Sequence, residues 1–108
     1  MLELQEYLDT QGVSPFRSWF DDLDPVAAAK VTVALGRIEQ GNLSGVKSVG
    51  KGVLEYRIDF GPGYRIYFGR DGRLLVILLG GGTKKRQQQD VERAATRWTD
   101  YKSRKRGN

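Results

Sequence analysis

The fold is decided by residues 56–68, which read Tyr56-Arg57-Ile58-Asp59-Phe60-Gly61-Pro62-Gly63-Tyr64-Arg65-Ile66-Tyr67-Phe68. This stretch predicts two short strands joined by a Gly-Pro-Gly turn. Side chains alternate across a strand, so one face collects the apolar set Tyr56, Ile58, Phe60, Tyr64, Ile66 and Phe68. The other face carries Glu55, Arg57, Asp59, Arg65 and Tyr67. We expect the apolar face to lie on a core and the polar face to stay open for a phosphate or a carboxylate.

The remaining sequence predicts a single α+β domain over residues 1–108, with elements in the order β-α-α-β-β-β-α and a mainly antiparallel sheet. Ser14 and Asp24 each precede a proline, which predicts two capped helices, and Gly41 is placed to end the second one. The expected elements are an edge strand at 2–8, helices at 15–20 and 25–40, strands at 53–60, 64–69 and 73–79, and a helix from about 84.

Three further stretches of the sequence carry their own signals. Residues 42–52 are rich in glycine and serine and predict irregular chain. Asp71-Gly72 predicts a two-residue hairpin turn. The unbroken apolar run 74–79 predicts either a central strand covered on both faces or a face awaiting a partner, and the glycines at 80–82 are expected to end it.

The composition excludes several kinds of site. The chain has no cysteine and no histidine, which removes disulfides, cysteine nucleophiles and the commonest metal ligands. We therefore expect no metal and no other cofactor. The N-terminus lacks the basic and apolar regions of a signal peptide, and the longest apolar run is too short to span a bilayer. These features predict a cytoplasmic protein without a membrane partner.

Positive charge gathers in the C-terminal quarter. Residues 84–108 contain nine lysines and arginines against three acids, whereas residues 1–83 contain nine against ten. This asymmetry favours an anionic partner, with nucleic acid as the first candidate. For the basic tail at about 102–108, a role in solubility is an equal alternative.

A second basic feature lies at the start of the last predicted helix. Lys84, Lys85 and Arg86 follow the glycine run and oppose the helix dipole, which favours acids at this position. A helix start with free N–H groups and added cations suits a phosphate. The alternative is a solvated helix start.

Together with Pro15-Phe16-x-x-Trp19 and the loop at 45–50, these motifs resemble the phage Gp49-like, HigB-type branch of the RelE/ParE toxins. The resemblance runs from about Leu4 to Ala95. It implies a RelE-like, microbial-ribonuclease-like fold, in which two N-terminal helices and a C-terminal helix accompany an antiparallel sheet.

The resemblance also implies a function: a type II toxin, held inactive by an antitoxin from the adjacent gene that is a helix-turn-helix protein of the HigA kind. Its partners would be the ribosome and mRNA, and it would cleave the RNA through attack of a 2′-OH on the adjacent phosphate. The positions expected to act in catalysis are Arg57, Arg65, Lys84 and Arg86. Those expected to hold RNA or phosphate are Lys47, Lys51, Lys85, Gln87 and Tyr67.

Chemistry restricts these roles. A guanidinium does not lose its proton in proteins, so Arg57 and Arg65 suit phosphate binding and charge stabilisation. A proton would have to move through Lys84, Lys85, Asp59, Glu55 or Tyr67.

Four alternatives stay open. Asp59 stands where RelE-type toxins carry a lysine, and the C-terminal tyrosine or histidine of several relatives is missing. A ParE-like inhibitor of DNA gyrase and a non-catalytic nucleic-acid-binding module are therefore alternatives to the ribonuclease. Arg57, Asp59 and Arg65 could also form a structural ladder of ion pairs, and Lys47 and Lys51 could belong to a solvated loop.

Overall fold

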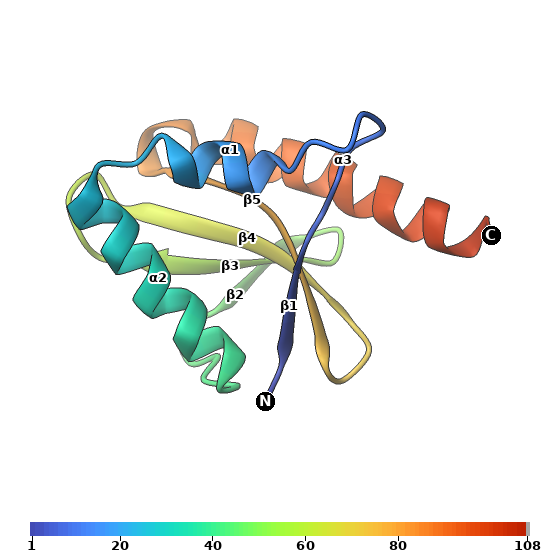
Figure 1. The fold of residues 1–108 in the computed structure, drawn as a ribbon, viewed down its shortest axis with the longest axis horizontal. Coiled ribbons are helices and arrows are strands. Elements are labelled where there is room, and N and C mark those ends of the chain that lie inside the picture. The colour runs from blue at the N-terminus through green and yellow to red at the C-terminus, as the bar shows by residue number, and fades with distance from the viewer. Residues whose placement is uncertain (108) are drawn as a thin grey trace.

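The computed structural model describes residues 1–107, which contain five strands and three α-helices arranged as Figure 1 shows. In chain order these are β1 (Glu3–Glu6), α1 (Pro15–Asp21), α2 (Pro25–Glu39), β2 (Lys47–Gly50), β3 (Val53–Ile58), β4 (Tyr64–Asp71), β5 (Leu75–Thr83), the 3₁₀ turn η1 (Lys84–Arg86) and α3 (Gln87–Arg106). The α+β class is therefore confirmed.

The two N-terminal helices begin where the sequence predicts. The Ser14 hydroxyl accepts a hydrogen bond from the Arg17 amide at 2.9 Å, and the Asp24 carboxylate accepts one from the Ala27 amide at 2.9 Å. These bonds satisfy backbone donors that the first helical turn leaves free. Gly41 follows α2 with φ of 78°, a conformation that glycine adopts without a steric penalty.

The sheet is mixed and has the strand order β1-β5-β4-β3-β2. β1 lies at one edge of the sheet, where the sequence predicts an edge strand, and it runs parallel to β5. The other neighbouring strands are antiparallel. The prediction of irregular chain over 42–52 is wrong in part, because residues 47–50 form β2 and pair with β3. Only Val49 of β2 is half-buried, so this strand lacks the apolar alternation that identifies a strand in sequence.

Helices cover both faces of the sheet, with α2 in front of it and α3 behind it in Figure 1. α1 and α2 pack on the face that carries Ile66 and Val76. α3 packs on the opposite face, where Ile77 belongs to the same core as Trp98. β5 is therefore a central strand buried on both sides, which is the first of the two explanations for its apolar run.

The prediction that the glycine run ends the strand is wrong, because β5 continues to Thr83. The glycines allow two helices to approach the strand closely. A Cβ atom on Gly81 would lie 2.3–2.5 Å from ring atoms of Trp19, and one on Gly82 would lie 2.0 Å from the Asp90 carboxylate. The run therefore marks close helix packing within a strand.

This packing predicts the effect of one methyl group. Gly81→Ala is expected to lower the free energy of unfolding by about 1–3 kcal/mol, because the Trp19 ring must leave its place. Gly36→Ala is the matched control: Gly36 lies inside α2, and among the described residues its added Cβ would meet no atom within 4 Å outside its own helical turn. The control should raise stability by up to about 1 kcal/mol. Urea denaturation measures both, and equal effects of the two variants would contradict the packing described.

Two predicted boundaries move by a few residues. Asp71 pairs with Leu75, so the turn between β4 and β5 has three residues and not two. Lys84–Arg86 form η1, and α3 begins at Gln87 with Asp90 in its first turn. The cations thus precede α3, and its first turn contains an acid, which suits the helix dipole.

The basic segment expected at 102–108 starts inside a helix. α3 continues to Arg106, Gly107 follows as its C-cap, and Asn108 lies outside the described residues. Cations in the last turn of a helix interact favourably with its dipole. Within residues 1–107, no helix has both the length and the apolar character needed to cross a membrane.

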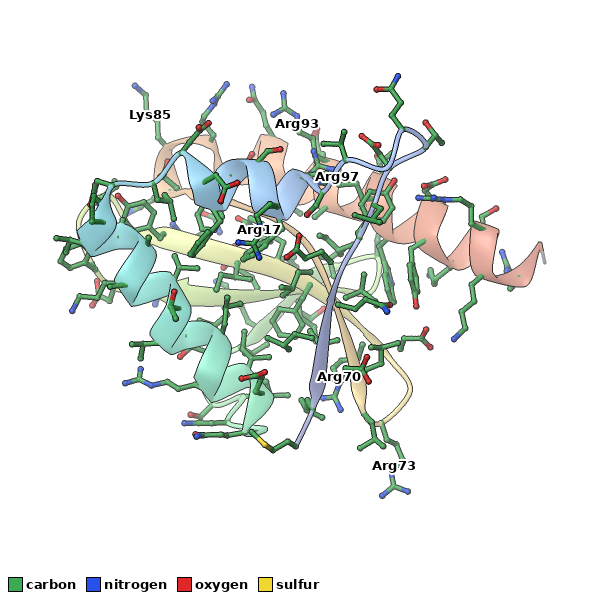
Figure 2. All side chains as sticks on the ribbon, in the orientation of Figure 1. Arg17, Arg70, Arg73, Lys85, Arg93 and Arg97 are labelled. Carbon is green, nitrogen blue, oxygen red and sulfur yellow. The ribbon has the colours of Figure 1, made fainter. Side chains whose placement is uncertain are left out.

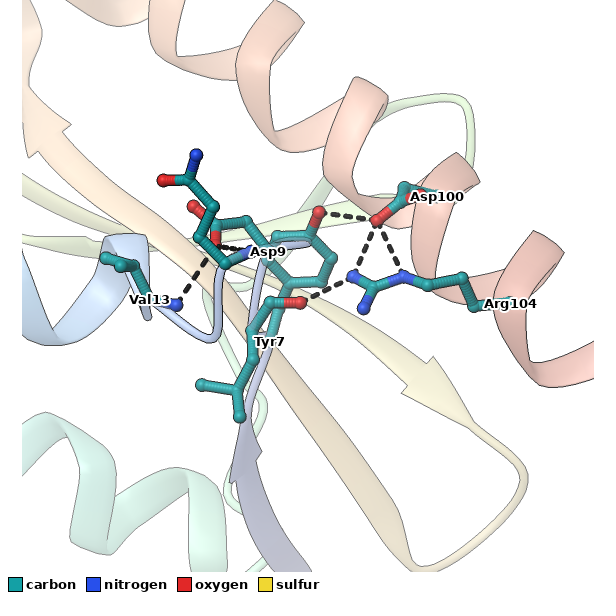
Figure 3. A network of polar contacts seen from close by, with 7 residues as sticks. Tyr7, Asp9, Val13, Asp100 and Arg104 are labelled. Atoms are coloured by element: carbon teal, nitrogen blue, oxygen red, sulfur yellow. Dashed lines mark hydrogen bonds and ion pairs between the residues drawn. The ribbon is translucent and has the colours of Figure 1, made fainter.

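Polar networks hold the C-terminal half of α3 against the sheet. The Tyr7 hydroxyl donates to Asp100 at 2.6 Å, and Arg104 binds the same carboxylate and the Leu8 carbonyl, as Figure 3 shows. These contacts join α3 to the chain that follows β1.

A second network joins α3 to the end of β4. Asp71 accepts hydrogen bonds from the Lys105 ammonium at 2.6–2.7 Å and from the Tyr101 hydroxyl at 2.6 Å. Tyr101 therefore has a structural role.

The two carboxylates predict an acid limit to stability. Hydrogen bonds from Lys105 and Tyr101 lower the pKa of Asp71, and those from Tyr7 and Arg104 lower the pKa of Asp100. A lowered pKa in the folded state stabilises the protein above the unfolded value of about 3.9, and this contribution disappears as the pH falls through the folded value. Thermal melts should therefore lose stability below about pH 4. Asp71→Asn should make the melting temperature less dependent on pH in this range, and an unchanged dependence would contradict the role of Asp71.

Candidate functional site

The polar face of the β3–β4 hairpin is mostly covered, which corrects the expectation of an open face. Glu55 and Arg65 expose 1% and 3% of their surface, and Tyr67 is fully buried. The cover is α3, which packs on this face. Sequence alternation predicted correctly which residues share the face, but it contains no information about which helix lies on it.

Beneath the start of α3 lies a buried polar cluster, formed by Glu55, Arg65, Tyr67 and Gln87. Glu55 stands opposite Tyr67 in the β3–β4 register. Its Oε2 accepts a hydrogen bond from Gln87 Nε2 at 2.8 Å and lies 3.6 Å from Arg65 Nε. The structure thus pairs Arg65 with Glu55, whereas the sequence suggested a ladder through Asp59.

Several polar atoms of the buried polar cluster have no hydrogen-bond partner within residues 1–107. They are Glu55 Oε1, Arg65 Nε and the Tyr67 hydroxyl. Buried polar groups are normally paired, because an unpaired one costs about 1–3 kcal/mol. Three such atoms in one place mark the buried polar cluster as a candidate site.

Burial determines what Tyr67 can do. Loss of solvent and the neighbouring Glu55 carboxylate raise the pKa of the Tyr67 hydroxyl well above its usual value. The hydroxyl is therefore neutral at physiological pH and can donate a hydrogen bond. This shift favours Tyr67 as a hydrogen-bond donor over Tyr67 as the base in proton transfer.

Exposed cations lie directly beside the buried polar cluster. They form the basic turn, Lys84–Arg86, which is the whole of η1. The Gly63 carbonyl accepts hydrogen bonds from the Lys84 amide at 3.0 Å and from Arg65 Nη1 at 2.8 Å. This shared acceptor holds the start of the basic turn next to the Arg65 guanidinium. Figure 2 shows the Lys85 side chain pointing away from the body of the molecule. The basic turn therefore presents charge to solvent next to a buried arginine.

The other predicted site residues are more scattered. Arg57 is exposed and lies opposite Arg65 in the register, and Lys47 lies beside Glu55 on β2. Lys51 lies in the β2–β3 turn, at the opposite end of β3 from the hairpin turn, with φ of 56°. The structure thus brings Arg57 and Lys47 to the cluster and leaves Lys51 apart from it.

The acid that pairs with the arginine is Glu55, and not Asp59 as the sequence had suggested. Asp59 is exposed and forms no ion pair within residues 1–107. Glu55 binds both Arg65 and Gln87. A signal for Glu55 existed in the sequence, since it shares a strand face with Arg57, but its helix partner Gln87 lies 32 positions away and only the fold brings them together.

Comparisons with known proteins show the family to which the chain belongs. A model of the family described as phage-derived protein Gp49-like matches residues 18–99, a range that contains the buried polar cluster and the basic turn. A protein of Haemophilus influenzae, described as uncharacterized, is 42% identical over 80 residues, which cover 73% of this chain and 81% of that protein.

Proposed function

Because the chain belongs to the phage-derived Gp49-like family, a family of RelE-like addiction-module toxins, we propose that it is a toxin that cleaves mRNA on the ribosome. Family membership indicates a toxin–antitoxin module, and the nuclease activity is our proposal within it. The observation that supports it most is a buried arginine–carboxylate pair with unpaired atoms, placed directly under a cationic turn. A cytoplasmic site of action follows from the ribosome as target.

The cations supply the binding of RNA. Lys84, Lys85 and Arg86 are exposed and can contact phosphates along a strand, as can Arg57 on the neighbouring hairpin. Arg65 is suited to the scissile phosphate, because its planar guanidinium binds two oxygens and remains charged. Charge that develops on the phosphate oxygens would be stabilised by this group.

Access to Arg65 requires a small movement, since the side chain is buried in the free protein. The Gln87–Glu55 hydrogen bond holds the start of α3 over it, and a typical bond of this kind contributes about 0.5–1.5 kcal/mol. Thr83, the N-cap of the basic turn, makes no capping bond with its side chain. We propose that RNA binding shifts the basic turn and Gln87 and so exposes Arg65.

Glu55 is the base that we propose for the reaction. Once the start of α3 has moved, Glu55 Oε1 can take the proton of the 2′-OH as the 2′ oxygen bonds to phosphorus and the bond to the 5′ oxygen breaks. The leaving 5′ oxygen needs a proton, which Lys84 or Lys85 can donate from the basic turn. The products are a 2′,3′-cyclic phosphate and a 5′-hydroxyl. Tyr67 is retained as a neutral donor that orients the phosphate or the carboxylate.

The burial of Arg65 also supports a second candidate, a ParE-like inhibitor of DNA gyrase that binds without catalysis. The two functions differ in what they leave intact. After induction of the chain in cells, the nuclease should produce new mRNA ends inside codons while plasmids stay supercoiled. A gyrase inhibitor should relax plasmids and leave mRNA whole.

The antitoxin provides a separate test. Co-expression of the adjacent gene, which we propose to encode a helix-turn-helix antitoxin of the HigA kind, should restore growth. Growth arrest that no neighbouring product relieves would contradict the toxin–antitoxin assignment of the gene pair.

A further inference from the structure

A cleft between α1 and the start of α3 lies outside the buried polar cluster. It has a volume of about 290 Å³, and its charged residues are Arg86, Asp90, Arg93 and Arg97. Asp90, Arg93 and Arg97 follow one another at intervals of three and four, so they form one stripe along α3, and Arg86 lies just before its start. This stripe is separate from the residues of α3 that pack on the sheet, such as Ala94 and Trp98.

The floor of the cleft is a strand edge without a neighbouring strand. β1 pairs only with residues 75–78 of β5, so residues 79–83 have no strand partner on that side within residues 1–107. Gly81 and Gly82 contribute bare backbone to the cleft. Arg97 Nη1 donates to the Leu79 carbonyl at 3.0 Å, which fixes one guanidinium at the end of this edge.

The charges of the cleft are not balanced. Three arginines face one aspartate, which leaves two positive charges in excess. Arg86 and Arg93 form no ion pair within residues 1–107. Burial and then the neighbouring Arg93 lower the pKa of Arg97, and burial raises the pKa of Asp90. An anion in the cleft would offset this excess.

We propose that this cleft binds a phosphate group of an RNA backbone through Arg86, Arg93 and Arg97. Guanidinium groups offer planar pairs of donors that match phosphate oxygens. The proposal rests on RNA as the ligand of the proposed function and adds a second phosphate site to it. Arg86 ends the basic turn, and Arg93 lies about 9 Å along the α3 axis from Gln87, the next residue, at 1.5 Å per residue. Figure 2 shows Lys85 and Arg93 projecting from the same side of the molecule, and Arg97 lines the cleft with Arg93, so one strand can pass from the basic turn to the cleft.

The shape favours a phosphate over an acidic peptide. A peptide strand would have to pair with the backbone edge at residues 79–83. Trp19 lies over one face of that segment and Asp90 over the other, and the Leu79 carbonyl already accepts a hydrogen bond from Arg97. The small volume suits one phosphate and its sugar.

Nuclear magnetic resonance titration tests the binding. Inorganic phosphate and then a five-nucleotide RNA are added to the full chain, and the amide signals of Gly81 and Gly82 are followed. We expect both ligands to shift these signals. Arg93→Gln should weaken RNA binding about three- to tenfold and reduce the slope of log affinity against log salt by about 0.7. Arg37→Gln is the control, because Arg37 is exposed on α2, and its affinity should equal that of the wild type.

Arg93→Gln is informative because the Arg93 side chain is exposed and forms no ion pair in the part of the chain that the structure describes, so the fold does not depend on it. Unmoved signals of Gly81 and Gly82, or an RNA affinity equal to that of the control, would overturn the proposal. So would a variant that binds the antitoxin more weakly and RNA as before. Failure of the nuclease is recognised separately: RNA would bind the wild-type cleft and remain uncleaved on ribosomes.

Discussion

Arg65→Lys is expected to abolish growth arrest and to lower the rate of mRNA cleavage about 100- to 1,000-fold. Lysine keeps the positive charge beside Glu55 but has no planar pair of donors for a phosphate. It also cannot bind the Gly63 carbonyl and a phosphate through separate nitrogens, as a guanidinium can. The measurements are colony formation after induction and primer extension on cellular mRNA.

Lysine is a better test than alanine at this position. The sequence places the Arg65 side chain outside the apolar set, which would make truncation harmless to the fold. The structure buries it against Glu55, so Arg65→Ala would leave a buried carboxylate without its partner and lower stability. Arg37→Lys on the exposed surface of α2 is the control and should remain toxic. Full toxicity of Arg65→Lys, with expression equal to the control, would remove Arg65 from the site.

Glu55→Ala is expected to lower the free energy of unfolding by about 3–5 kcal/mol, because it leaves the Arg65 guanidinium buried and unpaired. Gln87 loses its acceptor in the same variant. Urea denaturation followed by circular dichroism measures the loss. The double variant Glu55→Gln/Arg65→Met should recover most of it, since neither replacement carries a charge. A loss below about 1 kcal/mol in Glu55→Ala would indicate that the pair is reached by solvent and is not buried as described.

The local parts of the fold could be predicted from sequence because their causes are local. Capping by Ser14 and Asp24 and the strand alternation around Gly63 involve residues a few positions apart. The prediction that the glycine run ends β5 is wrong for a non-local reason. Its glycines are required by side chains that belong to α1 and α3, and only the folded chain brings Trp19 to Gly81.

The sequence predicted which residues lie near one another in the candidate site better than it predicted which of them are buried and paired. Arg57, Arg65 and the basic turn do lie together, because the hairpin and the end of β5 are neighbours in the sheet. The burial of Arg65 could not be predicted, since it depends on which face α3 covers. The pairing of Glu55 with Gln87 and the cleft at Arg93 depend on the same helix position.

Cleavage of a 5′-labelled mRNA on purified ribosomes, with a defined codon in the A site, tests most directly whether Arg65 and Glu55 form a nuclease site. We expect the wild-type chain to cut within that codon and to leave a 2′,3′-cyclic phosphate, and Arg65→Lys to leave the RNA whole. If the wild-type chain arrests growth when it is expressed in cells but leaves this mRNA intact on ribosomes, the nuclease proposal is contradicted.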